Sequence, residues 1–237
     1  NIVDVTHHVT PFDVHEAAVY IKDSFRYFPS RTVFACVTLP ETGVKDDVVG
    51  IRTPQGHTYF SSNNGLLTHI IREAGVAEAY RVTATQVRRP VIDPTFYGRD
   101  IVMSAAAHIA NGVALCEVGP AITLADLVTL PISVPAMVDG WLVGEVAILD
   151  KNFGNVWTTI TQEVLSQHGI GIGTQLEIQL GDLRMTTPLL RTFGEVKLMQ
   201  PLAYIASRQQ LGVALNQGNF AAVHGTKRGD RIRLRKQ

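Results

Sequence analysis

The sequence has few cysteines, no excess of charge of either sign and no long apolar run. Its two cysteines, Cys36 and Cys116, lie in apolar stretches, which favours buried thiols over a disulfide and suits a reducing, cytoplasmic compartment. The 21 basic and 21 acidic residues cancel, so no overall field attracts nucleic acid or a membrane surface. No apolar run approaches the roughly 18 residues of a membrane span, and no signal peptide is visible.

The sequence also lacks the motifs of common metal and cofactor sites. It contains neither HExxH nor Cys-x-x-Cys, and we expect His7, His8 and His108 to be a loop pair and a helix-packed histidine rather than ligands. The glycine-rich run at residues 169–174 lacks the third glycine of a dinucleotide fingerprint. The alternating arginines of residues 231–235 predict one solvated strand face rather than a nucleic-acid patch. We therefore expect no metal and no redox cofactor.

What the sequence does have is 46% apolar content over 237 residues, enough for one large domain or two modest ones. Strand and helix patterns alternate up to about residue 129, which predicts an α/β domain with a mainly parallel central sheet at residues 1–130. Two prolines and no periodicity predict a linker at residues 131–140. Short strands between glycine turns then predict an all-β domain, a small barrel or sandwich, at residues 141–237.

Hydrophobic periodicity and turn residues predict the individual elements. In the N-terminal domain we expect strands at Ile2–Thr6, Thr32–Thr38, Val48–Arg52, His57–Phe60 and Val76–Val82, and helices after Pro11, after the caps Asn63 and Asn64, and over Ile101–Gly112. The third and fourth of these strands form a hairpin. In the C-terminal domain we expect strands at Trp141–Leu149, Val156–Ile160, Gln175–Leu180, Leu202–Ala206 and Arg231–Leu234.

The stretch from Asp93 to Asp100 has the most distinctive composition. Pro94 and Gly98 bracket the adjacent aromatics Phe96 and Tyr97, and a helix of small apolar residues is predicted next. The stretch is therefore a loop that leads into a helix N-terminus, where unpaired N–H groups favour anions. The alternative is an ordinary aromatic turn before a core helix.

Several stretches, in chain order, carry a resemblance to one family. They are Thr38–Gly43, Asn63–Leu67, Pro94–Gly98, Phe153–Thr158, and Ala206–Arg208 followed by Leu215–Phe220. Together they resemble the S-adenosylmethionine (SAM)-dependent nucleophilic halogenases, the 5'-chlorinase and fluorinase, within the wider SAM hydroxide adenosyltransferase family. The match is closest to the chlorinase.

The resemblance implies substitution at C5' of SAM by a halide, giving 5'-chloro-5'-deoxyadenosine and L-methionine. Chloride is favoured, with bromide and iodide as further candidates. SAM is the substrate and the halide a co-substrate, and no other cofactor is implied. Two alternatives stay open: a SAM hydrolase that gives adenosine and L-methionine, and a catalytically silent SAM- or adenosine-binding protein.

For the catalytic end, the part of the site where the halide attacks C5', the resemblance implies Leu39, Thr42, Phe96, Tyr97 and Gly98. The hydrolase branch activates water with an Asp, an Arg and a His, and those positions here hold Leu39, Asp47 and Tyr97. The halogenases carry Tyr at the position of Leu39, and the fluorinase carries Ser where this chain and the chlorinase have Gly98. Fluoride is strongly hydrated and needs more donors, so a glycine-lined pocket suits a larger halide.

For substrate binding, the resemblance implies residues from both domains. Asp150 and Asn155 are expected to hydrogen-bond SAM and Phe153 to pack against it, although a turn between strands would also explain the two polar residues. The other implied contacts are Phe12, Trp157, Phe193, Ser207, Arg208 and Asn216.

The resemblance also implies an assembly. The family forms trimers with each site between one subunit's N-terminal domain and a neighbour's C-terminal domain. We expect a homotrimer rather than a hexamer, because the tight turn Thr53–His57 replaces a long insertion of the fluorinase. The family begins with a strand and an Asp-containing loop that holds the ribose, and that segment is expected before Asn1.

Overall fold

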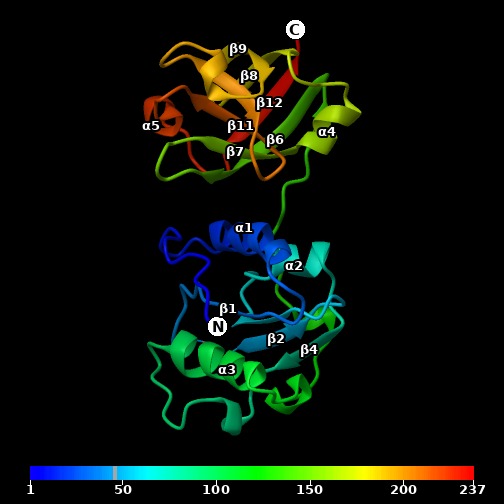
Figure 1. The fold of residues 1–237 in the computed structure, drawn as a ribbon, viewed down its shortest axis with the longest axis vertical. Helices are drawn as coiled ribbons and strands as arrows, with labels where there is room; N and C mark the ends of the chain where they lie inside the picture. The colour runs from blue at the N-terminus through cyan, green and yellow to red at the C-terminus, as the bar shows by residue number, and fades with distance from the viewer. Residues whose placement is uncertain (45–46) are drawn as a thin grey trace. The chain divides into compact units, whose positions relative to one another are not determined.

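The computed structural model describes residues 1–44 and 47–237. The chain divides into two compact units, Asn1–Pro131 and Ile132–Gln237 (Figure 1). Part of the segment expected as a linker is not a linker, because Ala136–Val138 forms strand β5 and pairs with β6. None of the helices in the described residues is long and apolar enough to cross a membrane.

The sheet of the N-terminal unit is mixed, so the prediction of a mainly parallel sheet is wrong. Its described strands lie in the order β1-β3-β2-β4. They are β1 (Val33–Cys36), β2 (Val48–Arg52), β3 (Thr58–Ser62) and β4 (Glu78–Arg81). Only β1 and β3 run parallel, whereas β2 is antiparallel to both β3 and β4. The reason is the predicted hairpin: a turn closed by the Gly56 N–H on the Thr53 carbonyl reverses the chain without a helix.

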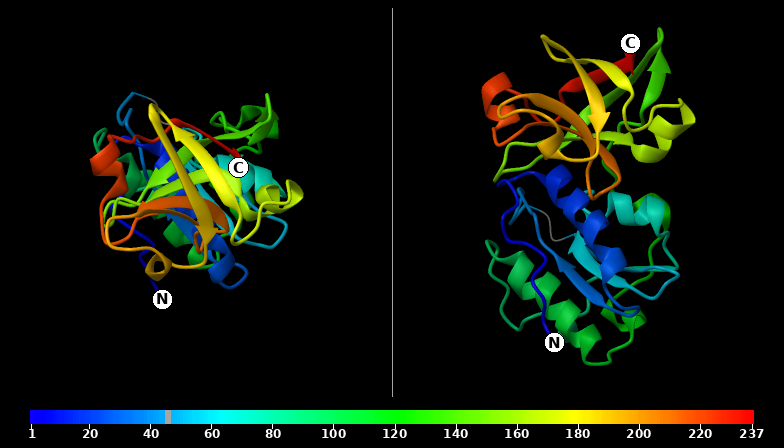
Figure 2. Two further views of the ribbon diagram at one scale, coloured as in Figure 1. Left: turned by 90° about the horizontal axis from the view of Figure 1, so that it is seen from above. Right: turned by 45° about the horizontal axis from the view of Figure 1, so that its top comes forward.

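Helices cover both faces of this sheet (Figures 1 and 2). They are α1 (Val14–Ser24), α2 (Thr68–Glu73), a π-helix at Gly98–Met103 and α3 (Ser104–Ala110), with 3-10 turns at Phe25–Tyr27, Thr85–Val87, Leu115–Val118 and Leu124–Asp126. Successive residues of a strand point to opposite faces of the sheet, so the strands supply side chains to two separate cores, one on each face. Phe34, Ile51 and Tyr59 pack with α1 and α2, while Val48 and Phe60 pack with the π-helix and α3.

Three predicted elements of this unit differ in the structure. The expected strand Ile2–Thr6 is not a strand: Ile2 and Val3 are 97% and 64% exposed, and no described strand supplies the hydrogen bonds that a strand needs. Helix α2 begins only at Thr68, because Asn64 instead accepts the Leu66 N–H and shapes the preceding turn. The helix expected from residue 101 begins as a π-helix at Gly98.

The C-terminal unit is a closed β-barrel. In residues 132–237, all of which the structure describes, eight strands lie in the order β12-β8-β9-β10-β11-β7-β6-β5, and β12 also pairs with β6. They are β5, β6 (Trp141–Leu149), β7 (Val156–Thr161), β8 (Gln175–Leu180), β9 (Leu183–Leu190), β10 (Pro201–Ile205), β11 (Gln210–Leu215) and β12 (Arg231–Lys236). The β6–β12 pairing closes the ring and leaves β5 outside it. Neighbours are antiparallel except β9 and β10, which run parallel.

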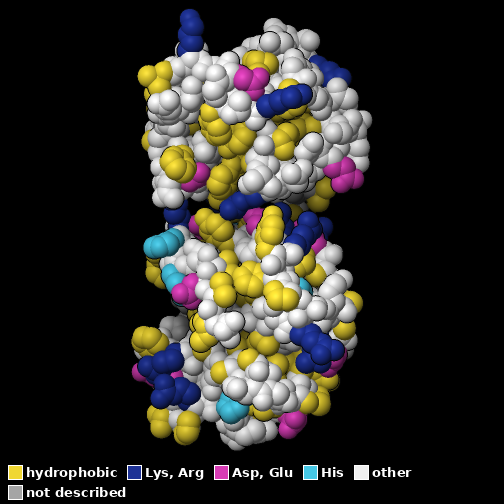
Figure 3. All heavy atoms as spheres, viewed as in Figure 1, with side chains coloured by type: hydrophobic (Ala, Val, Ile, Leu, Met, Phe, Trp, Pro, Cys, Tyr) yellow, Lys and Arg dark blue, Asp and Glu magenta, His cyan; other side chains and the backbone are white. Residues whose placement is uncertain are grey.

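Short helices α4 (Gln162–Gln167) and α5 (Phe220–His224) and a 3-10 turn at Phe193–Glu195 connect the strands. The barrel interior is filled by aliphatic side chains, such as Leu142 and Val146 on β6 and Ile178 and Leu180 on β8. All five strands expected in this unit are present. The surface carries no dominant sign of charge on the face in Figure 3, where basic and acidic side chains lie scattered among neutral ones.

Candidate functional site

The C-terminal unit holds a cavity of about 860 Å³. Aromatic and carboxamide side chains dominate its lining: Phe153, Trp157, Phe193 and Tyr204, with Asn152, Asn155, Asn216, Gln217 and Asn219. Among the described residues, no charged side chain lines it. Apolar walls with a few polar groups are typical of small-molecule sites, and amides can both donate to and accept from a ligand.

The aromatic wall is rigidly built. The indole N–H of Trp157 donates to the Tyr204 hydroxyl over 2.8 Å, and the Phe193 and Tyr204 rings lie 4.8 Å apart between centroids. The Arg208 guanidinium lies 4.5 Å from the centre of the Trp157 ring, a cation–π geometry. Burial raises the pKa of Tyr204, so the hydroxyl stays neutral. The wall offers flat apolar surface to a planar ring.

Asp150 builds the turn that carries the cavity's polar edge. One carboxylate oxygen accepts the N–H groups of Asn152 and Phe153 at 3.0 and 3.3 Å. The other lies 3.4 Å from Nδ2 of Asn155, which is only 8% exposed. A carboxylate only accepts hydrogen bonds, so it holds the amide nitrogen of Asn155 on its own side. Asp150 itself is not among the lining residues; the structure gives it a role in the turn.

Asn216 also has a structural partner. Its side-chain Nδ2 donates to the Val196 carbonyl over 2.8 Å, and its backbone carbonyl accepts the Met199 N–H at 2.9 Å. These bonds tie strand β11 to the segment that carries Phe193. Asn216 therefore positions an aromatic wall of the cavity as well as lining it.

The structure thus brings together nearly all the residues predicted from this domain. Phe153, Asn155, Trp157, Phe193, Ser207 and Asn216 line the cavity, with Arg208 against Trp157 and Asp150 in the supporting turn. Sequence reasoning did not name four of the polar or aromatic lining residues: Asn152, Tyr204, Gln217 and Asn219. A signal for Tyr204 existed, because it alternates with Leu202 and Ala206 on one face of β10.

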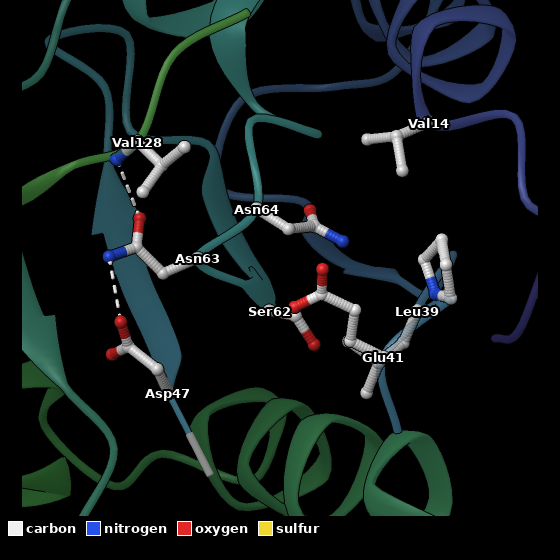
Figure 4. A pocket seen from close by; sticks show the side chains of 9 residues that line it. Val14, Leu39, Glu41, Asp47, Ser62, Asn63, Asn64 and Val128 are labelled. Carbon is white, nitrogen blue, oxygen red and sulfur yellow. Dashed lines mark hydrogen bonds between the residues drawn. The ribbon is translucent and has the colours of Figure 1, made fainter. Parts of the chain in front are cut away.

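The N-terminal unit holds a second cavity, of about 310 Å³ (Figure 4). Its lining residues are Val14, Leu39, Pro40, Glu41, Asp47, Ser62, Asn63, Asn64 and Val128. Figure 4 shows the Glu41 side chain extending toward Asn64. Asn63 donates to the Asp47 carboxylate over 3.0 Å and accepts the Val128 N–H over 2.8 Å. Arg81 pairs with the same carboxylate at 2.8 Å, which offsets its charge.

The residues predicted for the catalytic end lie on two loops that meet. Leu39 lines the second cavity, whereas Thr42 is not in its lining. A Cβ on Gly43, beside Thr42, would lie 3.1 Å from the Pro94 carbonyl oxygen, so the two loops touch there. Tyr97 is half-buried against the core under α3.

Two predicted aromatic residues are exposed. Phe96 is 54% exposed, and the Arg99 guanidinium lies 4.7 Å from its ring centre. Phe12 is 76% exposed at a positive φ of 69°, a conformation that is uncommon for a bulky residue. Within the N-terminal unit, the structure does not bring Phe12 into the cavity that Leu39 lines.

A buried carboxylate anchors the loop before the π-helix. Asp100 is completely buried and accepts two bonds from the Arg99 guanidinium, at 2.6 and 2.9 Å, and one from the Asp93 N–H at 2.8 Å. Arg99 first, and then the Asp93 N–H, lower the pKa of Asp100 to about 2. Asp93 in turn accepts both the N–H and the hydroxyl of Thr95. The predicted loop leading into a helix N-terminus is confirmed.

Within the described residues, no group of three or more His, Cys, Asp and Glu side chains is placed to hold a metal ion.

Comparison with known families covers most of the chain. Residues 1–119 match the model of the SAM hydroxide adenosyltransferase N-terminal domain, and residues 144–233 match that of the C-terminal domain. A fluorinase of Actinoplanes sp. is 38% identical over 253 residues, covering 96% of this chain and 85% of the relative. An (R)-S-adenosyl-L-methionine hydrolase of Thermus thermophilus is 30% identical, covering 98% and 87%.

A solved structure has the same fold. The crystal structure of an uncharacterised conserved protein from Thermotoga maritima superposes with a TM-score of 0.93 at 29% identity, covering 100% of this chain and 89% of that one. Both units of the fold therefore have counterparts in a known protein.

Proposed function

Because the chain belongs to the SAM hydroxide adenosyltransferase family, we propose that it catalyses substitution at C5' of SAM by a halide, with chloride favoured. A halide lone pair forms the bond to C5' while the C5'–S bond breaks and its electrons pass to sulfur. The products are 5'-chloro-5'-deoxyadenosine and neutral L-methionine. The anion and the sulfonium lose their charges together, so a dry site favours the reaction.

The observation that supports the proposal most is where three side chains lie and what they contact. Leu39 presents an apolar wall, Asp47 is engaged by Arg81 and Asn63, and Tyr97 packs into the core. Leu39 offers no proton acceptor, and the Asp47 carboxylate is ion-paired with Arg81, whereas a halide needs no base. The fluorinase among the relatives supports halide chemistry.

The C-terminal cavity is proposed as the nucleoside-binding part. An adenine ring is flat and apolar on its faces and polar at its edge, which suits the aromatic walls and the amide-rich rim. We assign Phe153, Trp157 and Phe193 to ring packing and Asn155 to the polar edge. Ser207 and Arg208 are proposed for the amino-acid part, and Phe12 for the ribose.

The catalytic end is proposed around Thr42, Phe96 and Gly98, with Leu39 as the apolar wall. In a homotrimer, the N-terminal domain of one subunit and the C-terminal domain of its neighbour would complete each site. Light scattering at micromolar concentration tests this assembly, and a monomeric mass would contradict it.

A second candidate is SAM hydrolysis, and one observation favours it. Glu41 places a carboxylate in the cavity lined by Leu39, and a SAM hydrolase is among the relatives. In that reaction water would lose a proton to Glu41 as its oxygen bonds to C5' and methionine leaves. Adenosine would then replace the chlorinated nucleoside as the product.

One assay separates the candidates. Protein, SAM and saturating chloride are mixed in H₂¹⁸O, and products are identified by mass spectrometry. Halide substitution predicts 5'-chloro-5'-deoxyadenosine with methionine, and hydrolysis predicts ¹⁸O-labelled adenosine with methionine. Glu41→Gln should abolish only the second product. Tight SAM binding by calorimetry with neither product would show a silent binding protein.

A further inference from the structure

Gly98 lies against Val37 more closely than any side chain at position 98 would allow. A Cβ built on Gly98 would lie 2.7 Å from Cγ1 and 3.3 Å from Cγ2 of Val37. Carbon atoms attract each other at about 3.5–4.0 Å, so the shorter distance is a clash. Val37 follows the last residue of β1, and a β-branched side chain has few rotamers with which to move away.

The glycine is required by space rather than by backbone conformation. Gly98 is not among the residues with positive φ, so its backbone angles do not themselves demand glycine. The contact with Val37 is what excludes a side chain. Val37 therefore determines which residue position 98 can carry.

Position 98 matters because it begins the π-helix. The first N–H groups of a helix have no partner inside it, and in the described residues the N–H groups of Gly98 and Arg99 donate to no backbone acceptor outside it. A serine at position 98 would add a hydroxyl donor beside them. Val37 occupies the volume which that side chain needs.

Val37 also borders open space. It lines a cavity of about 100 Å³ together with neighbours that include Cys36 and Thr38. Truncating Val37 to alanine would remove both methyl groups nearest to Gly98 and join their volume to this cavity. A side chain at position 98 would then have room without movement of β1.

We propose that Val37 is a specificity-determining residue for the anion, an inference that rests on the proposed halide substitution. By keeping position 98 free of a side chain, Val37 leaves only backbone N–H donors there, which suits chloride and larger halides. A small, strongly hydrated halide lacks the extra donor that it needs to leave water.

The test is a double-mutant cycle with two readouts. The proteins are the wild type, Gly98→Ser, Val37→Ala and Val37→Ala/Gly98→Ser, with Val37→Ala/Gly98→Ala as the control that fills the space without a hydroxyl. Urea unfolding measures the contact, and product formation from SAM with fluoride or chloride at equal concentration measures specificity.

We expect Gly98→Ser alone to unfold at lower urea and to lose chloride turnover. Val37→Ala/Gly98→Ser should be more stable than the sum of the single effects predicts, and its ratio of fluoride to chloride turnover should rise by on the order of tenfold or more, since one preorganised donor changes a rate by about a hundredfold. The control Val37→Ala/Gly98→Ala should recover stability but leave the ratio of fluoride to chloride turnover unchanged.

Additive effects on unfolding, or a Gly98→Ser protein as stable as the wild type, would overturn the packing argument. Coupled unfolding with an unchanged halide ratio would overturn the specificity role. If no variant makes a halogenated nucleoside from any halide, halide substitution itself fails. Unfolding still reports the Val37–Gly98 contact in that case, so the two failures are distinguishable.

Discussion

The Tyr204 side chain reaches across strand β11 to accept a hydrogen bond of 2.8 Å from the indole of Trp157. The two residues lie on β10 and β7, with β11 between them, and Gly212 of β11 is paired with both. A Cβ on Gly212 would lie 2.5 Å from the Tyr204 ring. A glycine inside the strand thus lets the ring lie flat over the sheet and complete the cavity wall.

Gly212→Ala should therefore disturb the cavity more than Tyr204→Phe does. The added methyl pushes the ring away, and overpacking of this kind costs about 1–3 kcal/mol. Tyr204→Phe keeps the ring and removes one hydrogen bond, a loss of about 1 kcal/mol. Urea unfolding measures both, and calorimetry should show the larger loss of SAM affinity in Gly212→Ala. Equal SAM affinity in the two variants would contradict this account.

Asn216→Ala should raise KM for SAM several-fold with a smaller effect on kcat. The substitution leaves the Val196 carbonyl without its side-chain donor and loosens the segment that carries Phe193. Loss of one such hydrogen bond costs about 1 kcal/mol, roughly a fivefold change in an equilibrium constant. Asn152→Ala is the matched control, because Asn152 lines the same cavity and its side chain donates to no residue in the described chain. A KM as low as that of the control would refute the positioning role.

The stability of the N-terminal unit should fall in acid through Asp100. Its pKa is lowered from 3.8 to about 2 in the folded chain. Above about pH 5 the carboxylate is ionised in both states and its stabilisation is complete. As pH falls from about 5 to 2 the unfolded chain takes up the proton first, so stability is lost.

Asp100→Asn should remove that part of the pH dependence and lower stability at pH 7. Urea unfolding at pH 7, 4, 3 and 2.5 gives the free energy of unfolding at each pH. Asp4→Asn, at a side chain that is 73% exposed, is the control and should follow the wild type. If the slope of stability between pH 4 and 2.5 is the same in Asp100→Asn as in the wild type, the carboxylate does not anchor the loop.

The two thiols should differ in reactivity. Cys36 is buried, and burial raises its pKa to about 12, whereas Cys116 is exposed, so the expectation of two buried thiols is wrong for Cys116. Only thiolates react with disulfide reagents, so the native protein should release one equivalent of thionitrobenzoate at pH 8 and two in urea. Cys116→Ser should abolish the one equivalent of thionitrobenzoate that the native protein releases. Rapid reaction of both thiols in the native protein would show that the N-terminal core opens readily.

The parts of the fold that sequence predicted well are those in which local pattern and tertiary pairing agree. From Leu142 onward, strand β6 alternates buried and half-buried residues, and its predicted bounds match the structure. The parallel sheet was wrongly predicted because alternation of strands and helices does not reveal which strand pairs with which. Strand β11 was missed because it is buried throughout and holds Gly212 for the sake of Tyr204, a distant partner.

In the candidate site, too, sequence predicted the features set by local pattern and missed those set by distant partners. The turn from Phe153 to Trp157 was recognisable as a linear motif, and the structure places it on the cavity. Asp150 and Asn216 were predicted as ligand contacts, but their hydrogen bonds to the protein depend on neighbours that only the folded barrel brings close. The contact between Val37 and Gly98 joins positions far apart in sequence, and no local pattern could have indicated it.

The pairing of β12 with β6 has a consequence for the time order of synthesis. Strand β6 is among the first parts of the barrel to leave the ribosome, and its partner along that edge, residues 231–236, is among the last. Until then strands β6 and β8, which both pair with β12, each have one edge of unpaired backbone groups, and such edges can pair with other chains. Closing the barrel also requires a long loop of chain to be ordered, a slow step. The nascent barrel is therefore most prone to association with other chains while its last strand is still being made.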